Sequence, residues 1–468
     1  MDAIAVTIGI AVLIWGLVYA LRGSLLHGCL VFLVAALGLG RDFLRFDVGP
    51  LPLSIDRLLL VGLIVVYLVK RRLGLTDPKR MAWPEVAMFL LAIVLVVSFF
   101  SSTWELNAQG KVMVWQLVAG FLAPMIVYWI ARQSPIDQRG LLTTYAVFAL
   151  TGVYLSVTAL AEINQQWWLV HPSYIADPKV GIHFGRARGP MVNSQTLGMY
   201  LDVCLLCLWM LRRHLGRAGK VMLILLVPLF VAAIYATYTR CVWIGAGLCG
   251  LLVLGLPMSK RRRAVFVGAT LAAAALATAF QWDNLVRMQR QGGAEISELS
   301  AKSRLSFAYV SWKMFLDAPL LGVGYGRFQQ AVRPYLADRS TSLYLEDIRG
   351  EPNHNTLLAM LTETGLIGFG LLLALLAGWA VQSWRAWRNA AAPDWVRQHG
   401  LMMLGTLVLY LTPALFVDMR LAPQAQYLLF FMTGLTSGVA ARLPSPLATA
   451  YPSADGPIGT TLMPASWQ

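Results

Sequence analysis

The sequence predicts an all-α polytopic membrane protein with about 12 transmembrane helices. Hydrophobic residues make up 58% of the 468 residues and charged residues only 13%, whereas an ordinary soluble domain carries roughly 25% charged residues. Apolar stretches of about 20 residues, the length that crosses a bilayer, recur along the chain. Lys and Arg gather in the short links between these stretches, as in cytoplasmic loops of membrane proteins.

The first two apolar stretches are short, so residues 1–40 form either two spans or one span and a re-entrant or interfacial piece. Residues 1–20 lack a basic n-region and a good cleavage site, so we expect them to be retained and not removed as a signal peptide. The predicted spans lie near residues 3–20, 25–39, 53–69, 84–100, 111–131, 140–161, 197–211, 221–238, 241–258, 264–281, 355–381, 401–417 and 423–440.

Basic clusters in short loops fix the predicted orientation, because such loops stay in the cytoplasm. The clusters fall near residues 70–80, 212–220 and 260–263, and all lie on one side when the spans are threaded through them. The chain then divides into N-terminal spans over 1–281 with an outer loop at 162–196, a large outer loop at 282–354, C-terminal spans over 355–440, and a tail at 441–468. The tail is rich in Pro, Ser, Thr, Gly and Ala, so we expect a disordered cytoplasmic end.

Composition also narrows the class of function. Five cysteines are too few for a disulfide scaffold, and no Cys/His cluster indicates structural zinc. The net charge of +15 would favour nucleic acid as the partner of a soluble protein, but here much of it belongs to the cytoplasmic loops, so we expect no nucleic acid. No internal repeat and no string of intramembrane acidic residues is visible, which disfavours a secondary transporter.

Two arginines, Arg186 and Arg188, lie in the first outer loop just before a predicted helix. One guanidinium group can bind two phosphate oxygens at once, and the neighbouring glycines and proline let the backbone approach a ligand closely. The segment is a candidate site for a phosphate or diphosphate at a helix N-terminus. The alternative is that both arginines reach to lipid headgroups.

Arg240 stands alone in a tight outer turn between two apolar stretches. A charge at membrane depth costs about 2.5–3.5 kcal/mol on insertion scales, so such a residue usually has a partner or a function. Interfacial placement without a function is the alternative.

The large outer loop contains Arg304 and, at residues 318–328, a glycine-rich stretch. The glycines look like a nucleotide fingerprint, but no strand-to-helix unit surrounds them. We therefore expect a turn that joins an amphipathic helix to the next segment.

His354 ends the large outer loop and is flanked by Glu351, Asn353 and Asn355. Histidine has an ordinary pKa of about 6.5, so it takes up a proton near neutral pH and is the usual general base. Glu351 and Asn355 are available to orient its ring. The alternative is an interfacial histidine that is hydrogen-bonded for structure alone.

Metal binding and cysteine chemistry have weaker support. His171 and His183 have no carboxylate pair at ligand spacing, and the outer loops contain no DxD motif. Cys204 and Cys207 lie in an apolar stretch, where cysteine acts as a small hydrophobic residue. We expect no metal and no cofactor.

In the order of these motifs, residues 180–440 resemble the O-antigen ligase and polymerase superfamily of bacterial envelope glycosyltransferases, most strongly over 303–370. The chain departs from the commonest family pattern at Met191–Ser194, where many members have Asn-Pro or His-Pro. The resemblance rests on Arg188-Gly189 with Asn193, Thr239-Arg240, Arg304, Trp312, Pro319–Gly326, Asn353-His354-Asn355 and Glu363–Gly368.

The resemblance implies a GT-C-like fold with a large, partly helical periplasmic loop, in the bacterial inner membrane. It implies a metal-independent, inverting glycosyltransferase whose donor is a glycan on undecaprenyl diphosphate and whose active site faces the periplasm. The acceptor is then the lipid A core of lipopolysaccharide, for an O-antigen ligase, or a second lipid-linked glycan, for a polymerase. We favour the ligase; exopolysaccharide polymerisation and protein O-glycosylation stay open.

The residues can be given roles within this hypothesis. Arg188 and Arg240 would hold the diphosphate as its charge grows, and His354 would take the proton of the acceptor hydroxyl. Five further residues would support substrate binding: Arg186, Arg304, Asn193, Asn355 and Glu351. A lipid or polysaccharide transporter is the rival hypothesis, and it predicts that His354 is dispensable.

Overall fold

The computed structural model describes residues 22–38, 45–48, 51–101, 108–286 and 293–443. These residues are mainly helical, as expected for the all-α class. The predicted span at 3–20 and nearly all of the predicted tail at 441–468 lie outside the described residues.

Every predicted span from residue 25 onward coincides with helical structure, and the ends differ by at most seven residues. The span predicted at 111–131 consists of two α-helices joined by a π-helical turn, Val118–Leu122. A short antiparallel hairpin of β1 (Arg45–Val48) and β2 (Leu51–Ser54) precedes α3. The helices are α2 (Leu25–Gly38), α3 (Ile55–Arg72), α4 (Trp83–Phe100), α5 (Ala108–Leu117), α6 (Ala123–Arg132), α7 (Gln138–Ile163), α8 (Ser194–Leu211), α9 (Arg217–Ala236), α10 (Arg240–Gly255), α11 (Lys260–Val286), α12 (Gly293–Asp317), α13 (Phe328–Ala331), α14 (Thr356–Arg388), α15 (Asp394–Ala414) and α16 (Pro423–Ala440).

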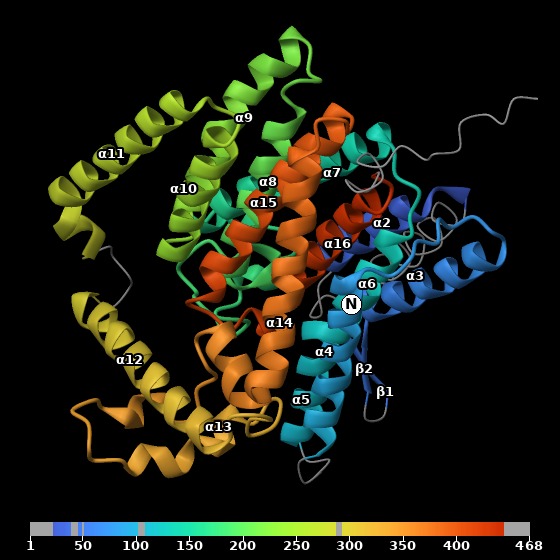
Figure 1. The fold of residues 1–468 in the computed structure, drawn as a ribbon. Helices are drawn as coiled ribbons and strands as arrows, with labels where there is room; N and C mark the ends of the chain where they lie inside the picture. The colour runs from blue at the N-terminus through green and yellow to red at the C-terminus, as the bar shows by residue number, and fades with distance from the viewer. Residues whose placement is uncertain (1–21, 39–44, 49–50, 102–107, 287–292, 444–468) are drawn as a thin grey trace, which may run out of the picture.

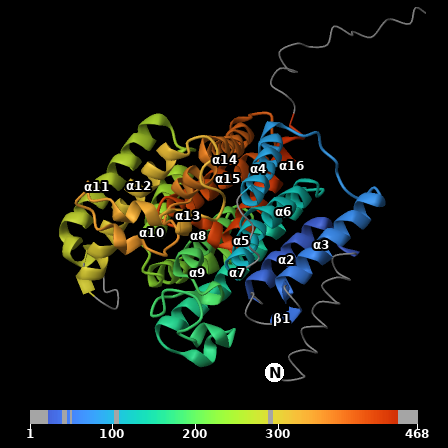
Figure 2. The same ribbon diagram turned by 90° about the horizontal axis from the view of Figure 1, so that it is seen from below.

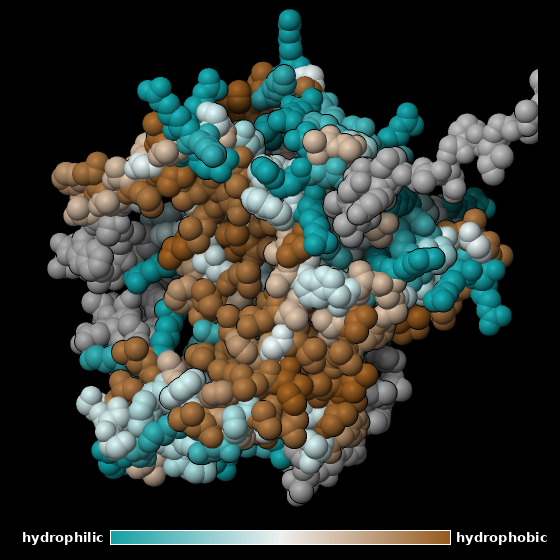
Figure 3. All heavy atoms as spheres, in the orientation of Figure 1, coloured by the Kyte–Doolittle hydropathy of each residue, from teal (hydrophilic) through white to brown (hydrophobic). Residues whose placement is uncertain are grey.

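Among the described residues, six helical stretches are long and apolar enough to cross a membrane, and two shorter apolar helices accompany them. The six are Trp83–Phe100, Met113–Arg132, Gln138–Ile163, Ser194–Leu211, Arg217–Ala236 and Thr356–Arg388. Figure 3 shows apolar residues across the middle of one face and hydrophilic residues gathered toward both ends. The protein is therefore a multi-pass membrane protein, while the number of about 12 spans stays a prediction.

The centre of the bundle is formed by α8, α14, α15 and α16 (Figure 1). α6 packs along α16, α10 along α15 and α7 along α8, while α9 to α11 lie to one side and α2 and α3 to the other (Figures 1 and 2). Small residues allow these close approaches: a Cβ on Gly434 would lie 2.5 Å from the Tyr128 carbonyl oxygen. Close backbone contact at small residues is typical of helix packing in membranes.

α14 is broken at Gly365, although the sequence predicts one uninterrupted span over 355–381. Gly365 has φ +61° and ψ −163°, a conformation that a residue with a Cβ rarely adopts. The glycine-rich loop after α12 fills the break: Leu366 N donates to Pro319 O at 2.8 Å and Val323 N donates to Thr362 O at 2.9 Å. The apolar pattern runs through the break, so hydropathy does not reveal it.

Both ends of the segment before the break lie at one end of the bundle. At the start of α14, Thr356 Oγ1 donates to Val417 O just beyond α15 at 2.8 Å. At the end of the segment, Glu363 O accepts from Ser98 Oγ near the end of α4 at 3.4 Å. Residues 356–364 thus lie across this end, which we call the His354 end, and residues 366–388 form the part of α14 that can span the membrane.

We expect Gly365→Ala to destabilise the protein. An added Cβ would lie 2.3 Å from the backbone C and O of Leu320, and the strained φ alone costs about 1–3 kcal/mol. Thermal unfolding in detergent, followed by size-exclusion chromatography, measures the loss.

Gly370→Ala is the matched control, because Gly370 lies in the regular part of α14 with nothing within 4 Å of the added Cβ. Equal thermal stability of the two variants would contradict the packing of the loop into the break.

Candidate active site

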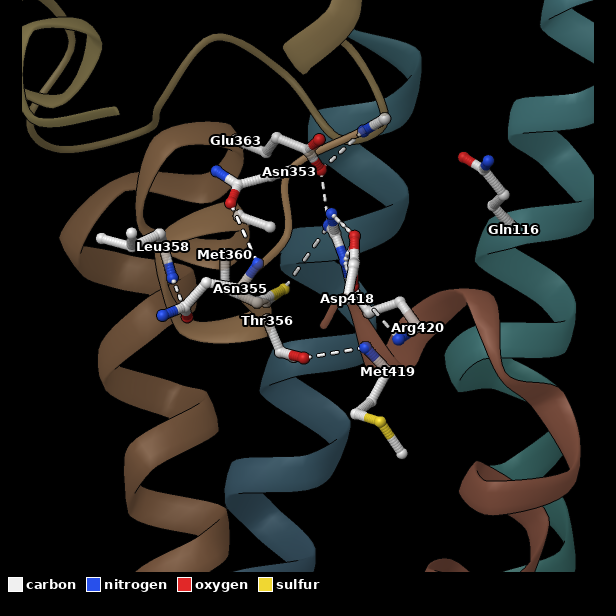
Figure 4. Close-up of polar contacts among 12 residues, drawn as sticks. Gln116, Asn353, Asn355, Thr356, Leu358, Met360, Glu363, Asp418, Met419 and Arg420 are labelled. Carbon is white, nitrogen blue, oxygen red and sulfur yellow. Dashed lines mark hydrogen bonds and ion pairs between the residues drawn. The ribbon is translucent and has the colours of Figure 1, made fainter. Parts of the chain in front are cut away.

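His354 is held directly before the first turn of α14. Asn355 caps this helix: its Oδ1 accepts from Leu357 N at 2.9 Å and from Leu358 N at 3.0 Å. Its Nδ2 donates to Leu415 O, at the end of α15, at 2.9 Å. Figure 4 shows Asn355 beside Leu358 at the start of the helix. The bond to Leu415 O ties this helix start, and with it His354, to the end of α15.

α12 contacts the same segment from the large loop. The edge of the Phe307 ring meets the His354 ring, with centroids 4.9 Å apart and an interplanar angle of 90°. Asn353 Nδ2 donates to Ser311 Oγ at 2.9 Å, while Asn353 Oδ1 accepts from Asn355 N at 3.1 Å. α12 and α14 together fix the place of the imidazole.

The surroundings of His354 favour its neutral form. Its pKa is lowered below its ordinary value, first because the packed groups desolvate the ring and also because Arg304 is positively charged. The negative charges of Glu351 and Asp418 act in the opposite direction and raise the pKa. A neutral imidazole at pH 7 is the form that can accept a proton.

Arg304 and Arg240 lie at the same site. Arg304 stands over the ring of Phe416, 5.2 Å from its centroid, and its charge acts on His354. Burial lowers the pKa of Arg304, and the charge of Arg240 at the start of α10 lowers it further. Arg304 is therefore within electrostatic reach of both His354 and Arg240, and Glu351 and Asn355 lie close to His354.

Arg188 is placed differently: it is fully buried and bound within the first outer loop. Its Nε donates to Glu162 Oε1 at 3.2 Å, and its Nη1 and Nη2 donate to Val180 O at 2.8 Å and Ile175 O at 2.6 Å. A direct contact with a diphosphate would require these bonds to open. The contacts favour a role for Arg188 in shaping the loop.

This loop is attached to the turn that carries Arg240. Ala187 N donates to Ala236 O at 3.0 Å, and Thr239 Oγ1 donates to Ser194 Oγ at 3.3 Å. Asn193, predicted to bind substrate, caps α8, and its Oδ1 accepts from Gln195 N at 2.9 Å. Arg186 is half-buried in the same loop. The substrate roles of these two residues stay predictions.

A buried cluster of Arg420, Asp418 and Glu363, which the sequence motifs did not reveal, lies beside the site (Figure 4). Arg420 Nε and Nη2 donate to Asp418 at 2.8 and 2.6 Å, and Nη1 donates to Glu363 Oε2 at 2.5 Å. Glu363 Oε2 also accepts from Gly326 N in the glycine-rich loop at 2.9 Å. A lone arginine in a short link between two apolar stretches, the signal that singled out Arg240, could have found Arg420.

The cluster acts on His354 through the backbone. Asp418 and Arg420 hold the link between α15 and α16, whose Leu415 and Val417 carbonyls accept from Asn355 and Thr356.

Among the residues that the structure describes, no group of three or more His, Cys, Asp or Glu side chains could hold a metal ion.

We expect Arg420→Met to cost about 3–5 kcal/mol, because it leaves two buried carboxylates without their cation. Chemical or thermal unfolding in detergent measures the change. Arg349→Met is the control, since Arg349 pairs with Glu346 on the surface, where a pair contributes about 0–1 kcal/mol. If Arg420→Met lowered the free energy of unfolding by no more than Arg349→Met does, the cluster would not be what orders the site.

Part of the chain resembles a known protein family. Residues 221–373 match a family described as O-antigen ligase, and this segment includes Arg240, Arg304, His354 and Glu363. No curated protein matches the chain. The match confirms the resemblance seen in the sequence: over residues 221–373 the chain is similar to the O-antigen ligase family.

Proposed function

We propose that the protein is an inverting glycosyltransferase that moves a glycan from undecaprenyl diphosphate to an acceptor hydroxyl. The first choice of acceptor is the lipid A core, which makes the protein an O-antigen ligase of the bacterial inner membrane with its site on the periplasmic side. The observation that carries the proposal is that His354, held at the start of α14, lies within electrostatic reach of Arg304, which in turn lies within reach of Arg240.

The two arginines supply positive charge for the leaving group. Arg240 and Arg304 lie near enough for one charge to lower the pKa of the other, so an anion between them would relieve their repulsion. Charge grows on the diphosphate as the bond between C1 of the sugar and the phosphate oxygen breaks, and fixed positive groups aimed at that charge lower the barrier. In this proposal arginine takes the place of a metal ion.

His354 is the general base. It takes the proton of the acceptor hydroxyl while the oxygen forms its bond to C1 from the face opposite the diphosphate, so that the configuration inverts. The negative charge of Glu351 favours the imidazolium that results. Arg188 acts indirectly, by holding the loop attached to the Arg240 turn.

The experiment that tests the proposal uses envelope glycans from a deletion strain complemented with the wild type or with His354→Ala. We expect His354→Ala to abolish transfer while the protein still inserts in the membrane, because the acceptor loses its base. His214→Ala is the matched control, since His214 is an exposed histidine beyond the other end of α8. Gels that resolve glycan length provide the readout.

The glycan that accumulates identifies the reaction. Lipid-linked polymer without glycan on the lipid A core indicates a ligase, whereas single lipid-linked repeats indicate a polymerase, the alternative within the same family. A normal glycan profile in both His354→Ala and Arg240→Ala would overturn the catalytic roles and favour a transporter.

We further expect transfer by the purified protein to rise with pH through the pKa of His354 and to level off above it, because only the neutral imidazole accepts a proton. Since this pKa lies below the ordinary value, the plateau should extend into mildly acidic pH. Glu351→Gln removes a charge that raises the pKa, so the acidic limb should move to lower pH. A limb that stays in place in this variant would show that another group controls it.

A further inference from the structure

α12 carries an apolar face that no other described part of the protein covers. Leu305, Trp312 and Leu316 lie on one side of the helix, since positions three, four, seven and eleven apart share a face. Their side chains are 60%, 55% and 57% exposed, and Ala308, also exposed, lies between them. We call these four residues, with the exposed Leu320 and Leu321 that follow, the apolar stripe.

The other faces of α12 have their own partners. Phe307, Val310 and Met314 pack into a small core with α13 and the turns of residues 333–348. On the polar face, Lys313 donates to Asp338. α12 therefore has three different faces. One is buried in the small core, one carries polar side chains, and the third, the apolar stripe, is apolar and exposed.

The stripe continues into the surface of a membrane span. The residues after α12 are joined to α14 directly past its break, where Ile367 N donates to Leu320 O at 3.3 Å. Leu366 and Ile367, which begin the long part of α14, are 49% and 43% exposed. Exposed apolar residues therefore occur on the span, at Leu320 and Leu321 where the loop joins the span, and on α12.

We infer that α12 is an interfacial helix whose apolar stripe lies in the hydrocarbon edge of the leaflet at the His354 end. A helix with one apolar and one charged face lies in the plane of such an interface, about 5–10 Å into the boundary between headgroups and acyl chains. Trp312 packs beside Phe315, with ring centroids 5.3 Å apart, and tryptophan is enriched at this depth. The occupant of the stripe is bilayer lipid.

This position has a direct consequence for the site. Arg304 and Phe307 lie on the same helix as the stripe, one turn or less from Leu305, so the depth of α12 also sets the depth of Arg304 and of the ring that contacts His354. The inference concerns where the helix sits and is independent of which glycan or acceptor the protein uses.

Site-directed spin labelling of the full-length protein in lipid nanodiscs tests the inference. Labels at Trp312→Cys and, in a second variant, Leu316→Cys are exposed to oxygen, which concentrates in hydrocarbon, and to a water-soluble nickel chelate. A label at Ser342→Cys, an exposed polar position of the same loop, is the aqueous control. All five native cysteines are buried, and the unsubstituted protein measures any background labelling.

We expect the ratio of oxygen to nickel accessibility to be several-fold higher at positions 312 and 316 than at 342. Equal ratios at the three positions would overturn the inference, because α12 would then lie in water. Protection of both stripe labels from both reagents would also overturn it, since the stripe would then be covered by protein.

Discussion

The pairing of buried Arg420 with Asp418 and Glu363 is the interaction on which the organisation of the His354 end depends. One guanidinium joins the link between α15 and α16 to the segment before the break in α14, and Glu363 joins that segment to the glycine-rich loop. Burying three charges is costly unless each is paired and hydrogen-bonded, and here each is. The same elements present the carbonyls that fix Asn355, and Asn355 fixes the start of the helix next to His354.

Much of the fold could be predicted from the sequence because hydropathy reports directly on burial in a bilayer. Predicted spans such as 140–161 and 423–440 match α7 and α16 closely. The break at Gly365 could not be predicted in this way, because Leu366 and Ile367 continue the apolar pattern through it. Its cause is a backbone docking between segments about forty residues apart, which no local pattern encodes.

The candidate site was partly predictable for a similar reason. Arg240, Arg304 and His354 stand out as polar residues next to apolar stretches, and such residues at membrane depth usually have a function. Arg188 gives the same signal, yet its charge is matched by Glu162, which lies 26 positions earlier at the end of α7. The sequence shows that an arginine lies in an unusual place, but the fold determines which group it pairs with. An arginine that anchors a loop and one that binds a ligand therefore cannot be distinguished from the sequence alone.

The docking of the glycine-rich loop into α14 also constrains how this protein can change. Within hydrocarbon, non-helical backbone is tolerated only where other protein groups satisfy it, and the freed amides of Leu366 and Ile367 are satisfied by loop carbonyls. A Cβ on Gly322 would lie 2.4 Å from the backbone of Glu363. The backbones of the loop and of α14 are therefore in almost direct contact, with no side chain between them at this position. The loop and the broken helix therefore form one structural unit, because a change of length in either would leave polar backbone without its partners.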